Sequence, residues 1–259
     1  MNLDVQVYPD LEALSRGAAE LVMSRANTCV QEKGFFTFVL SGGATPKRLY
    51  TLLGGEYRDR MPWPSTHIFW GDERNVPKES FESNFHLAYN AMISKAPIPV
   101  ENIHVVPTKP GDPESAAQAY EQVIKGFFQT KSVDAGRMSF DLVLLGLGSD
   151  GHTASLFPGD PVLGEKKRWV AAVHAPSAYK TRERITLTLP AINSADQAVF
   201  MVSGSGKKGV VKKILNGAGG EREKIPATMI QPKKELKWLL DTTVAEKLKS
   251  STLSSQPCP

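Results

Sequence analysis

The chain has 259 residues, of which 41% are hydrophobic and 22% charged, and these values are typical of a globular protein with a full core. The formal net charge of +4 is small and is spread along the sequence, which disfavours a nucleic-acid-binding protein. The longest apolar stretches have only the length of a strand, so the sequence predicts no membrane-spanning segment.

The first residues show no basic flank followed by an apolar run, so we expect no signal peptide and a cytoplasmic protein. The cysteines are Cys29, in a predicted helix, and Cys258, near the end of the sequence. This placement does not indicate a disulfide framework, and we expect free thiols.

The first predicted helix covers residues 10–33, because apolar residues recur on one of its faces. Asp10 is its expected N-cap, and Gly34 is its expected end. The apolar run over residues 35–40 then predicts a buried strand.

A second unit has the same order. Residues 66–70 predict a strand, residues 71–77 a loop, and residues 83–94 a helix. A further helix is expected from Asp112 to residue 129. The remaining predicted elements are strands near residues 140–145, 169–173, 184–189, 198–202 and 236–240, and a helix over residues 207–215.

The alternation of strands and helices predicts an α/β fold with a doubly wound, mostly parallel sheet sandwiched by helices. We expect a single domain over residues 1–249 and a flexible tail over residues 250–259. In such folds the loops at the carboxyl ends of the strands form the active site. Four loops qualify, and the strand directions place them at one edge of the sheet: residues 41–45, 71–77, 146–158 and 203–207.

The first of these loops, Ser41-Gly42-Gly43-Ala44-Thr45, joins a strand to a helix. Glycines let a ligand approach the backbone closely, and a helix N-terminus attracts anions, so the loop predicts a phosphate-binding site. Thr45 is the expected N-cap of the following helix, and Pro46 suits its first turn. The alternative is a tight turn that merely requires glycine.

The stretch from Gly146 to Gly151 has the spacing Gly-x-Gly-x-x-Gly after a strand. This spacing also occurs in dinucleotide-binding folds, but residues 152–161 cannot supply the long helix that such a site requires. We therefore do not expect a nicotinamide or flavin cofactor.

Within the same loop, Asp150 and His152 flank a glycine. An imidazole can accept a proton from water near neutral pH, and a carboxylate can fix its tautomer, so this pair predicts general-base chemistry. The alternative is a loop histidine bonded to the backbone. The other histidines are expected to be structural, and none has the spacing of a metal site: His67, His86, His104 and His174.

The loop after the second strand carries Asp72, Glu73 and Arg74. The guanidinium of Arg74 suits a phosphate or carboxylate ligand, although an ordinary ion pair within the loop is equally consistent with the pattern. Arg184 and Lys207 could complete an anion site, but alone each has the pattern of a surface charge.

Together these loops resemble the 6-phosphogluconolactonase family. The resemblance rests on the order and spacing of five segments, which cover nearly the whole chain: residues 40–46, 70–77, 83–84, 145–159 and 184–190. The long segment Gly151-His152-Thr153-Ala154-Ser155-Leu156-Phe157-Pro158 is the most specific of them.

The resemblance implies a fold similar to that of glucosamine-6-phosphate deaminase, and hydrolysis of 6-phospho-D-glucono-1,5-lactone in the pentose phosphate pathway without a cofactor. It implies that His152 is the general base with Asp150 beside it, that Arg74 lines the site, and that Asp72 either holds Arg74 or orders water. Binding of substrate and phosphate is implied for Ser41, Gly42, Gly43, Ala44, Thr45, Asn84, Gly148, Arg184 and Lys207. The partner is the small phosphorylated lactone, and we expect a monomer or weak dimer that binds neither nucleic acid nor membrane.

Two other functions remain open. The deaminase resembles this chain but has a glutamate five positions after its loop histidine, where this chain has Phe157, which cannot transfer a proton. A non-catalytic sugar-phosphate sensor of the same fold usually carries a helix-turn-helix module, for which the segment before residue 10 leaves no room.

Overall fold

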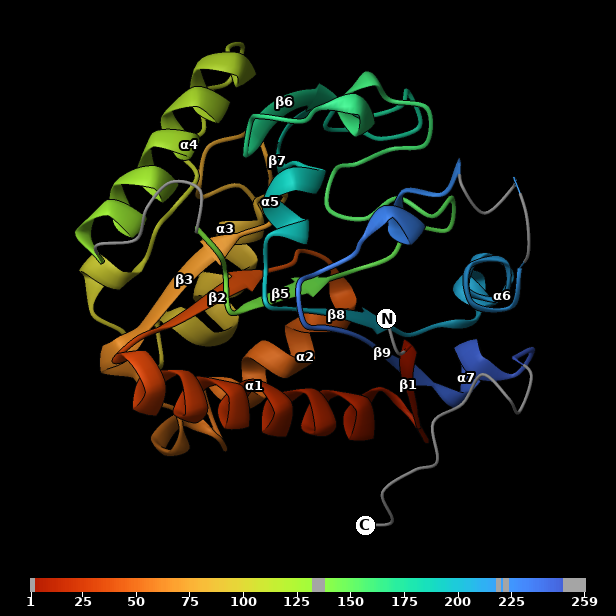
Figure 1. The fold of residues 1–259 in the computed structure, drawn as a ribbon, viewed down its shortest axis with the longest axis horizontal. Helices are drawn as coiled ribbons and strands as arrows, with labels where there is room; N and C mark the ends of the chain where they lie inside the picture. Colours follow the sequence, from red (N-terminus) through yellow and green to blue (C-terminus); the bar gives the residue numbers. More distant parts are fainter. Residues whose placement is uncertain (1–2, 132–137, 218–219, 221–223, 249–259) are drawn as a thin grey trace.

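The computed structural model describes residues 3–131, 138–217, 220 and 224–248. Within them, the main sheet is built from β1 (Leu3–Tyr8), β2 (Phe36–Leu40), β3 (Thr66–Trp70), β5 (Leu142–Leu145), β8 (Gln197–Val202) and β9 (Glu235–Asp241). All neighbouring strands are parallel, in the order β1-β9-β8-β5-β2-β3 (Figure 1). The predicted α/β fold with a mostly parallel sheet is confirmed.

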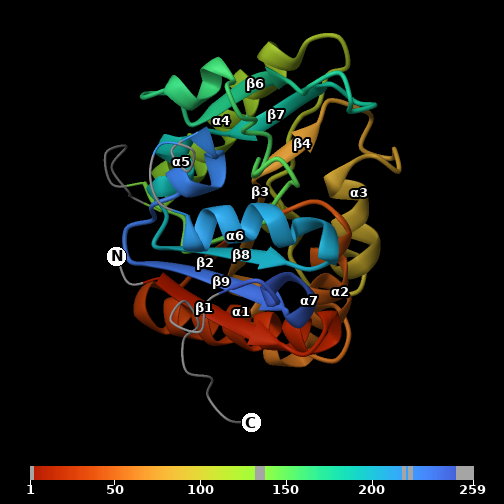
Figure 2. The same cartoon turned by 90° about the vertical axis from the view of Figure 1, so that its right-hand side faces the viewer.

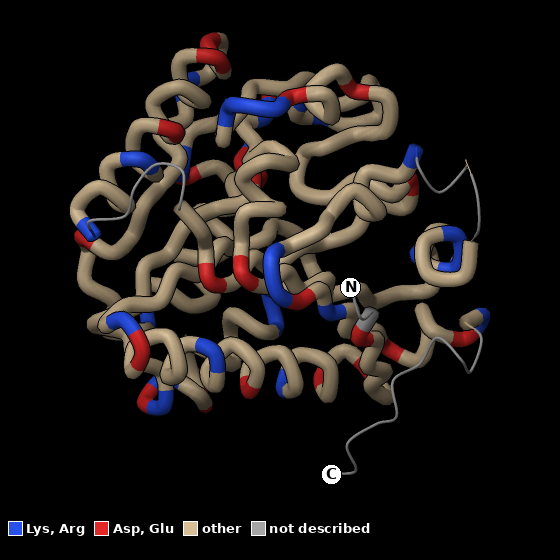
Figure 3. The backbone as a smooth tube through the Cα atoms, in the orientation of Figure 1, with Lys and Arg blue, Asp and Glu red and all other residues tan. Residues whose placement is uncertain are grey.

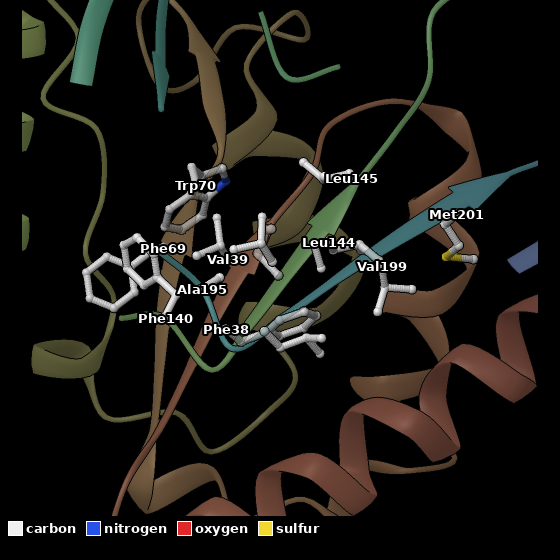
Figure 4. Packing of buried hydrophobic residues seen from close by; sticks show 14 of the residues in the cluster. Phe38, Val39, Phe69, Trp70, Phe140, Leu144, Leu145, Ala195, Val199 and Met201 are labelled. Atoms are coloured by element: carbon white, nitrogen blue, oxygen red, sulfur yellow. The ribbon is translucent and has the colours of Figure 1, made fainter. Parts of the chain in front are cut away.

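Four adjacent strands of this sheet, β8, β5, β2 and β3, are buried along their whole length. Continuous apolar runs predict this, because a strand covered on both faces cannot alternate apolar and polar side chains. Figure 4 shows how Val39, Leu144 and Val199, from β2, β5 and β8, pack in one continuous cluster.

Helices cover both faces of the sheet, with α1 (Leu11–Lys33) and α2 (Ala44–Leu53) on one face and α5 (Leu189–Asn193) and α6 (Lys208–Asn216) on the other (Figures 1 and 2). The ends of α1 are as predicted: the Asp10 carboxylate accepts the Ala13 N–H at 2.8 Å, and Gly34 ends the helix with φ of 83°. The short α7 (Thr242–Ala245) follows β9.

A second sheet stands over the first. It is antiparallel, with β4 (Asp72–Arg74), β7 (Glu183–Leu187) and β6 (Val170–His174) in that order, and α4 (Pro113–Thr130) packs against β6 and β7 (Figure 2). The prediction of a simple loop over residues 71–77 was therefore wrong in part. Asp72–Arg74 has no apolar pattern, and it is a strand because it pairs with β7.

Two further differences concern a strand and a helix. The strand β1 was not predicted, and it pairs with β9 at the edge of the main sheet. The helix expected over residues 83–94 is α3 (Asn84–Ala88) continued by a π-helix over Tyr89–Ile93. The other predicted elements agree to within two residues at each end.

Several expectations about the whole chain can be compared with this fold. Lys, Arg, Asp and Glu are scattered over the molecule rather than gathered in one region (Figure 3). No helix in the described part of the chain is long and apolar enough to cross a membrane. Cys29 is buried, and burial raises the pKa of its thiol to about 12. The single domain over residues 1–249 stays a prediction, while Cys258 and the predicted tail lie outside the described residues.

Candidate active site

A cavity of about 390 Å³ opens at the carboxyl ends of four adjacent strands, β8, β5, β2 and β3. Each of the four predicted loops contributes to its wall: Ser41–Pro46 after β2, Asp72 and Arg74 after β3, Gly146–Gly148 with His152–Ala154 after β5, and Met201–Ser203 with Lys207 after β8. The chain proceeds from β2 to β3 in one direction and from β5 to β8 in the other. The cavity therefore lies at the point where the strand order reverses, which is where ligands bind in open α/β sheets.

The N-terminus of α2 points at this cavity. The helix begins at Ala44, and its N-cap Gly43 makes no side-chain hydrogen bond, so the prediction that Thr45 caps the helix was wrong. Without a capping side chain, the first N–H groups stay available for an anion. Tyr50 fixes the loop from below, since its hydroxyl accepts the Ser41 N–H at 3.0 Å and donates to the Ser41 carbonyl at 2.6 Å.

The loop after β5 holds the predicted base. The Oδ1 atom of Asp150 lies 2.6 Å from Nδ1 of His152 and also accepts the His152 N–H at 3.1 Å. Gly148 donates its N–H to the His152 carbonyl at 2.8 Å, which closes the loop. Burial raises the pKa of Asp150, but the charge of His152 and its hydrogen bonds outweigh burial and leave this pKa below its usual value.

Two aromatic rings pack against the His152 imidazole. The ring of Phe157 lies 4.9 Å from the His152 ring, and the Tyr179 ring lies 5.7 Å from it at nearly a right angle. Phe157 is buried, and its apolar ring packs on the His152 imidazole.

Asp72 is held from two sides beneath the cavity. Its carboxylate accepts the Ser155 hydroxyl at 2.7 Å and the Asn84 amide at 3.3 Å, while the Asn84 amide also donates to the Asp72 carbonyl at 2.8 Å. The oxygen of the same side-chain amide, Oδ1 of Asn84, is buried and lacks a hydrogen-bond partner within the described residues. A Cβ at Gly42 would lie 2.0 Å from it, so only glycine fits there.

The side chains of β4 alternate between two environments, because successive residues of a strand face opposite sides. Asp72 and Arg74 face the cavity, whereas Glu73 faces α3 and accepts the Asn84 and Phe85 N–H groups at 2.7 and 2.8 Å. Burial raises the pKa of Glu73 despite these bonds. No ion pair joins Arg74 to either acid in the described structure, so the suggestions of an ion pair within the loop, and of Asp72 holding Arg74, were wrong.

Three cations near the cavity have no carboxylate within 4.0 Å among the described residues: Arg74, Arg184 and Lys207. Arg74 donates to the Glu82 carbonyl at 2.6 Å, and its Nε is buried without a partner. Burial lowers the pKa of Arg184, and the neighbouring charge of Arg74 lowers it further. Burial also lowers the pKa of Lys207. Such clustered positive charge favours an anionic ligand.

The structure brings most of the predicted site residues to the cavity wall. Three predicted residues do not line the cavity but lie next to residues that do: Asp150 beside His152, Asn84 beside Asp72, and Arg184 beside Arg74. Sequence analysis missed the supporting residues Tyr50, Glu73, Ser155 and Tyr179. Only Glu73 and Ser155 lie in the segments singled out by the sequence, and nothing local marks the other two.

Two of the remaining histidines pack away from the cavity. Nδ1 of His67 lies 3.3 Å from Nε2 of His104, the ring of Phe69 stacks on His104, and the ring of Phe127 packs at an angle against both. Burial and the charge of Lys131 lower the pKa of each imidazole to about 4. Their packing agrees with the structural role predicted for them.

Comparisons with known proteins agree with this geometry. A family model described as glucosamine-6-phosphate isomerases/6-phosphogluconolactonase matches residues 9–238. A Synechocystis protein named 6-phosphogluconolactonase is 41% identical over 250 residues, which are 96% of this chain and 100% of that protein.

Solved structures show the same likeness. The structure of 6-phosphogluconolactonase from Trypanosoma cruzi matches with a TM-score of 0.83 and 29% identity, over 96% of this chain and 97% of that one. A monomeric glucosamine-6-phosphate deaminase matches with a TM-score of 0.76 over 94% of this chain and 99% of that one, and its 18% identity shows a shared fold alone.

Proposed function

Because the chain belongs to the family of glucosamine-6-phosphate isomerases and 6-phosphogluconolactonases, we propose that it hydrolyses 6-phospho-D-glucono-1,5-lactone to 6-phosphogluconate, a step of the pentose phosphate pathway. One observation carries the proposal. A histidine paired with a carboxylate lines the same cavity as a helix N-terminus and unpaired cations. This arrangement combines a base for activating water with a binding site for a phosphate group.

The phosphate of the substrate binds at the N-terminus of α2. The N–H groups of residues 42–45 are available to donate there, while the Ser41 N–H is bound to Tyr50, and Lys207 contributes a positive charge from the cavity wall. Arg74 and Arg184 add to the positive potential from β4 and β7. A phosphate held in this way fixes the lactone ring within reach of the loop that carries His152.

His152 activates the attacking water. The Nδ1–H group of the neutral imidazole donates a hydrogen bond to Asp150, so Nε2 carries no proton. The described residues offer Nε2 no hydrogen bond. His152 removes a proton from water as the oxygen adds to the C1 carbonyl. Backbone N–H groups of the glycine-rich loops, or Arg74, stabilise the resulting oxyanion. The imidazolium then gives its proton to the ring oxygen as the C1–O bond breaks.

The assay of two reactions tests the function. Purified protein should hydrolyse the phosphorylated lactone well above the spontaneous rate. A coupled enzymatic oxidation of the 6-phosphogluconate formed measures this rate. It should release no ammonia from glucosamine 6-phosphate, because Phe157 stands where the deaminase loop has a carboxylate. Ammonia release at a rate that rivals lactone hydrolysis would contradict the proposal and leave the fold unaffected.

Three further properties are proposed with the function. We expect the enzyme in the cytoplasm, as a monomer or weak dimer, without contact to nucleic acid or membrane. A relative from Arabidopsis thaliana that is 38% identical is named as chloroplastic. Cell fractionation tests the location, and sedimentation velocity tests the oligomeric state.

A further inference from the structure

The turn between β6 and β7 places a tyrosine beside the base. The hydroxyl oxygen of Tyr179 lies 3.2 Å from Nδ1 of His152, the nitrogen that also faces Asp150. The edge of one ring meets the face of the other, with an angle of 86° between their planes. Tyr179 is partly buried and does not belong to the cavity wall.

The short Asp150 contact determines the role of the phenol. A distance of 2.6 Å between a carboxylate oxygen and Nδ1 requires a proton on that nitrogen, which donates to Asp150. The phenolic oxygen is then a second, weaker acceptor of the same proton. It restricts rotation of the imidazole about its Cβ–Cγ bond, because turning the ring would break both contacts.

The ring of Tyr179 is itself fixed. It packs 5.4 Å from Phe157, which also contacts the imidazole, within a small apolar cluster that includes Val173 and Ala175. The buried members of this cluster differ from those of the main core, and Val162 packs against both.

The same turn also reaches the predicted phosphate-binding side. The guanidinium of Arg184 lies 5.8 Å from the Tyr179 ring. The next residues of the turn, Lys180 and Thr181, bind the Glu82 carboxylate, and the carbonyl of Glu82 accepts from Arg74. The base and the two arginines thus share one support.

We propose that Tyr179 is a positioning residue for His152, which holds the imidazole in the orientation required for attack on the lactone. This inference rests on the proposed role of His152 as the general base. Tyr179 acts on catalysis through His152 alone, and its contribution appears in kcat rather than in substrate binding.

Removal of the hydroxyl tests the inference. Tyr179→Phe keeps the ring packing and should lower kcat roughly three- to tenfold, the factor expected for one neutral hydrogen bond, with KM changed less than twofold. Thermal unfolding should be unchanged. Tyr89→Phe is the matched control, because Tyr89 is half-exposed, packs on Phe85 and does not line the cavity, and its kcat should equal that of the wild type.

A double-mutant cycle separates positioning from a general structural effect. In the His152→Asn background the base is absent, so adding Tyr179→Phe should cause no further loss, measured with excess enzyme above the spontaneous rate. An unchanged kcat in Tyr179→Phe, or an equal loss in both backgrounds, would overturn the inference. If His152→Asn itself retained wild-type activity, the proposed mechanism would fail first, and the two failures are thus distinguishable.

Discussion

At Gly148 the missing side chain lets the Asp150–His152 pair lie directly against the backbone. A Cβ built at this position would stand 2.0 Å from Nδ1 of His152 and 2.5 Å from Oδ1 of Asp150. Atoms that close must move apart, and the two that would move belong to the proposed base and its partner. The requirement for glycine here follows from close approach rather than from backbone conformation.

Gly148→Ala should therefore lower kcat by about a hundredfold, the loss expected when a reacting group is displaced by about 1 Å. The fold should persist, because the Cβ meets only these two side chains among its three nearest atoms. Gly164→Ala is the control, since a Cβ there meets nothing within 4 Å. A Gly148→Ala enzyme with wild-type kcat would show that the pair can shift without consequence.

Lys207 tests the binding of phosphate. Lys207→Ala should lower kcat/KM for the phosphorylated lactone by roughly ten- to a hundredfold, since a charge-assisted contact is worth about 1.5–3 kcal/mol. Hydrolysis of unphosphorylated glucono-lactone should hardly change. Lys208→Ala is a matched control, because Lys208 pairs with Glu246 instead. Equal losses with both substrates would indicate a structural role for Lys207.

At the scale of elements, β4 organises the site through its alternation. Asp72 and Arg74 face the cavity, and Glu73, between them, accepts hydrogen bonds from the start of α3. The Ser83 hydroxyl also donates to Glu73, at 3.0 Å. The same carboxylate thus fixes both the strand and the segment that carries Asn84.

Glu73→Gln should destabilise the protein by about 1–3 kcal/mol, because an amide nitrogen would face N–H donors that now meet an oxygen. The midpoint of urea unfolding measures this loss. Glu79→Gln, an exposed change in the following loop, is the control and should leave the midpoint in place. An unchanged midpoint in Glu73→Gln would mean that the start of α3 does not depend on Glu73.

The sequence predicts the central strands and the four loops well because their signals are local. The apolar runs of β2 and β5 admit one interpretation, and the capping residues Asp10 and Asp112 accept the N–H groups expected of them. The second sheet was missed since β4 is polar and depends on pairing with β7. Tyr179 was missed for a similar reason, because its contact with His152 exists only after the turn has folded over the loop.

For the whole molecule, the His67–His104 pair links stability to pH. The pKa of each imidazole is lowered to about 4 in the folded protein, whereas an exposed histidine titrates near 6.5. Between these values the unfolded chain binds more protons, so unfolding becomes easier as the pH falls. Stability from this source is complete above about pH 6.5 and decreases progressively toward pH 4.

Urea midpoints measured at pH 7 and pH 5 test this linkage. The wild type should lose stability at pH 5, and His104→Gln should show a smaller difference between the two values. His174→Gln, which changes an exposed histidine, should keep the wild-type difference. The same pH dependence in His104→Gln as in the wild type would assign the effect to other groups.

The order of the strands has an evolutionary consequence. The candidate site residues follow the ends of four adjacent strands, whereas the strands themselves are held by apolar packing. Substitutions in the loops can therefore change the reaction while the packed strands stay the same. A deaminase with 18% identity shares this fold over 94% of the chain, so the fold persists although most of its residues differ.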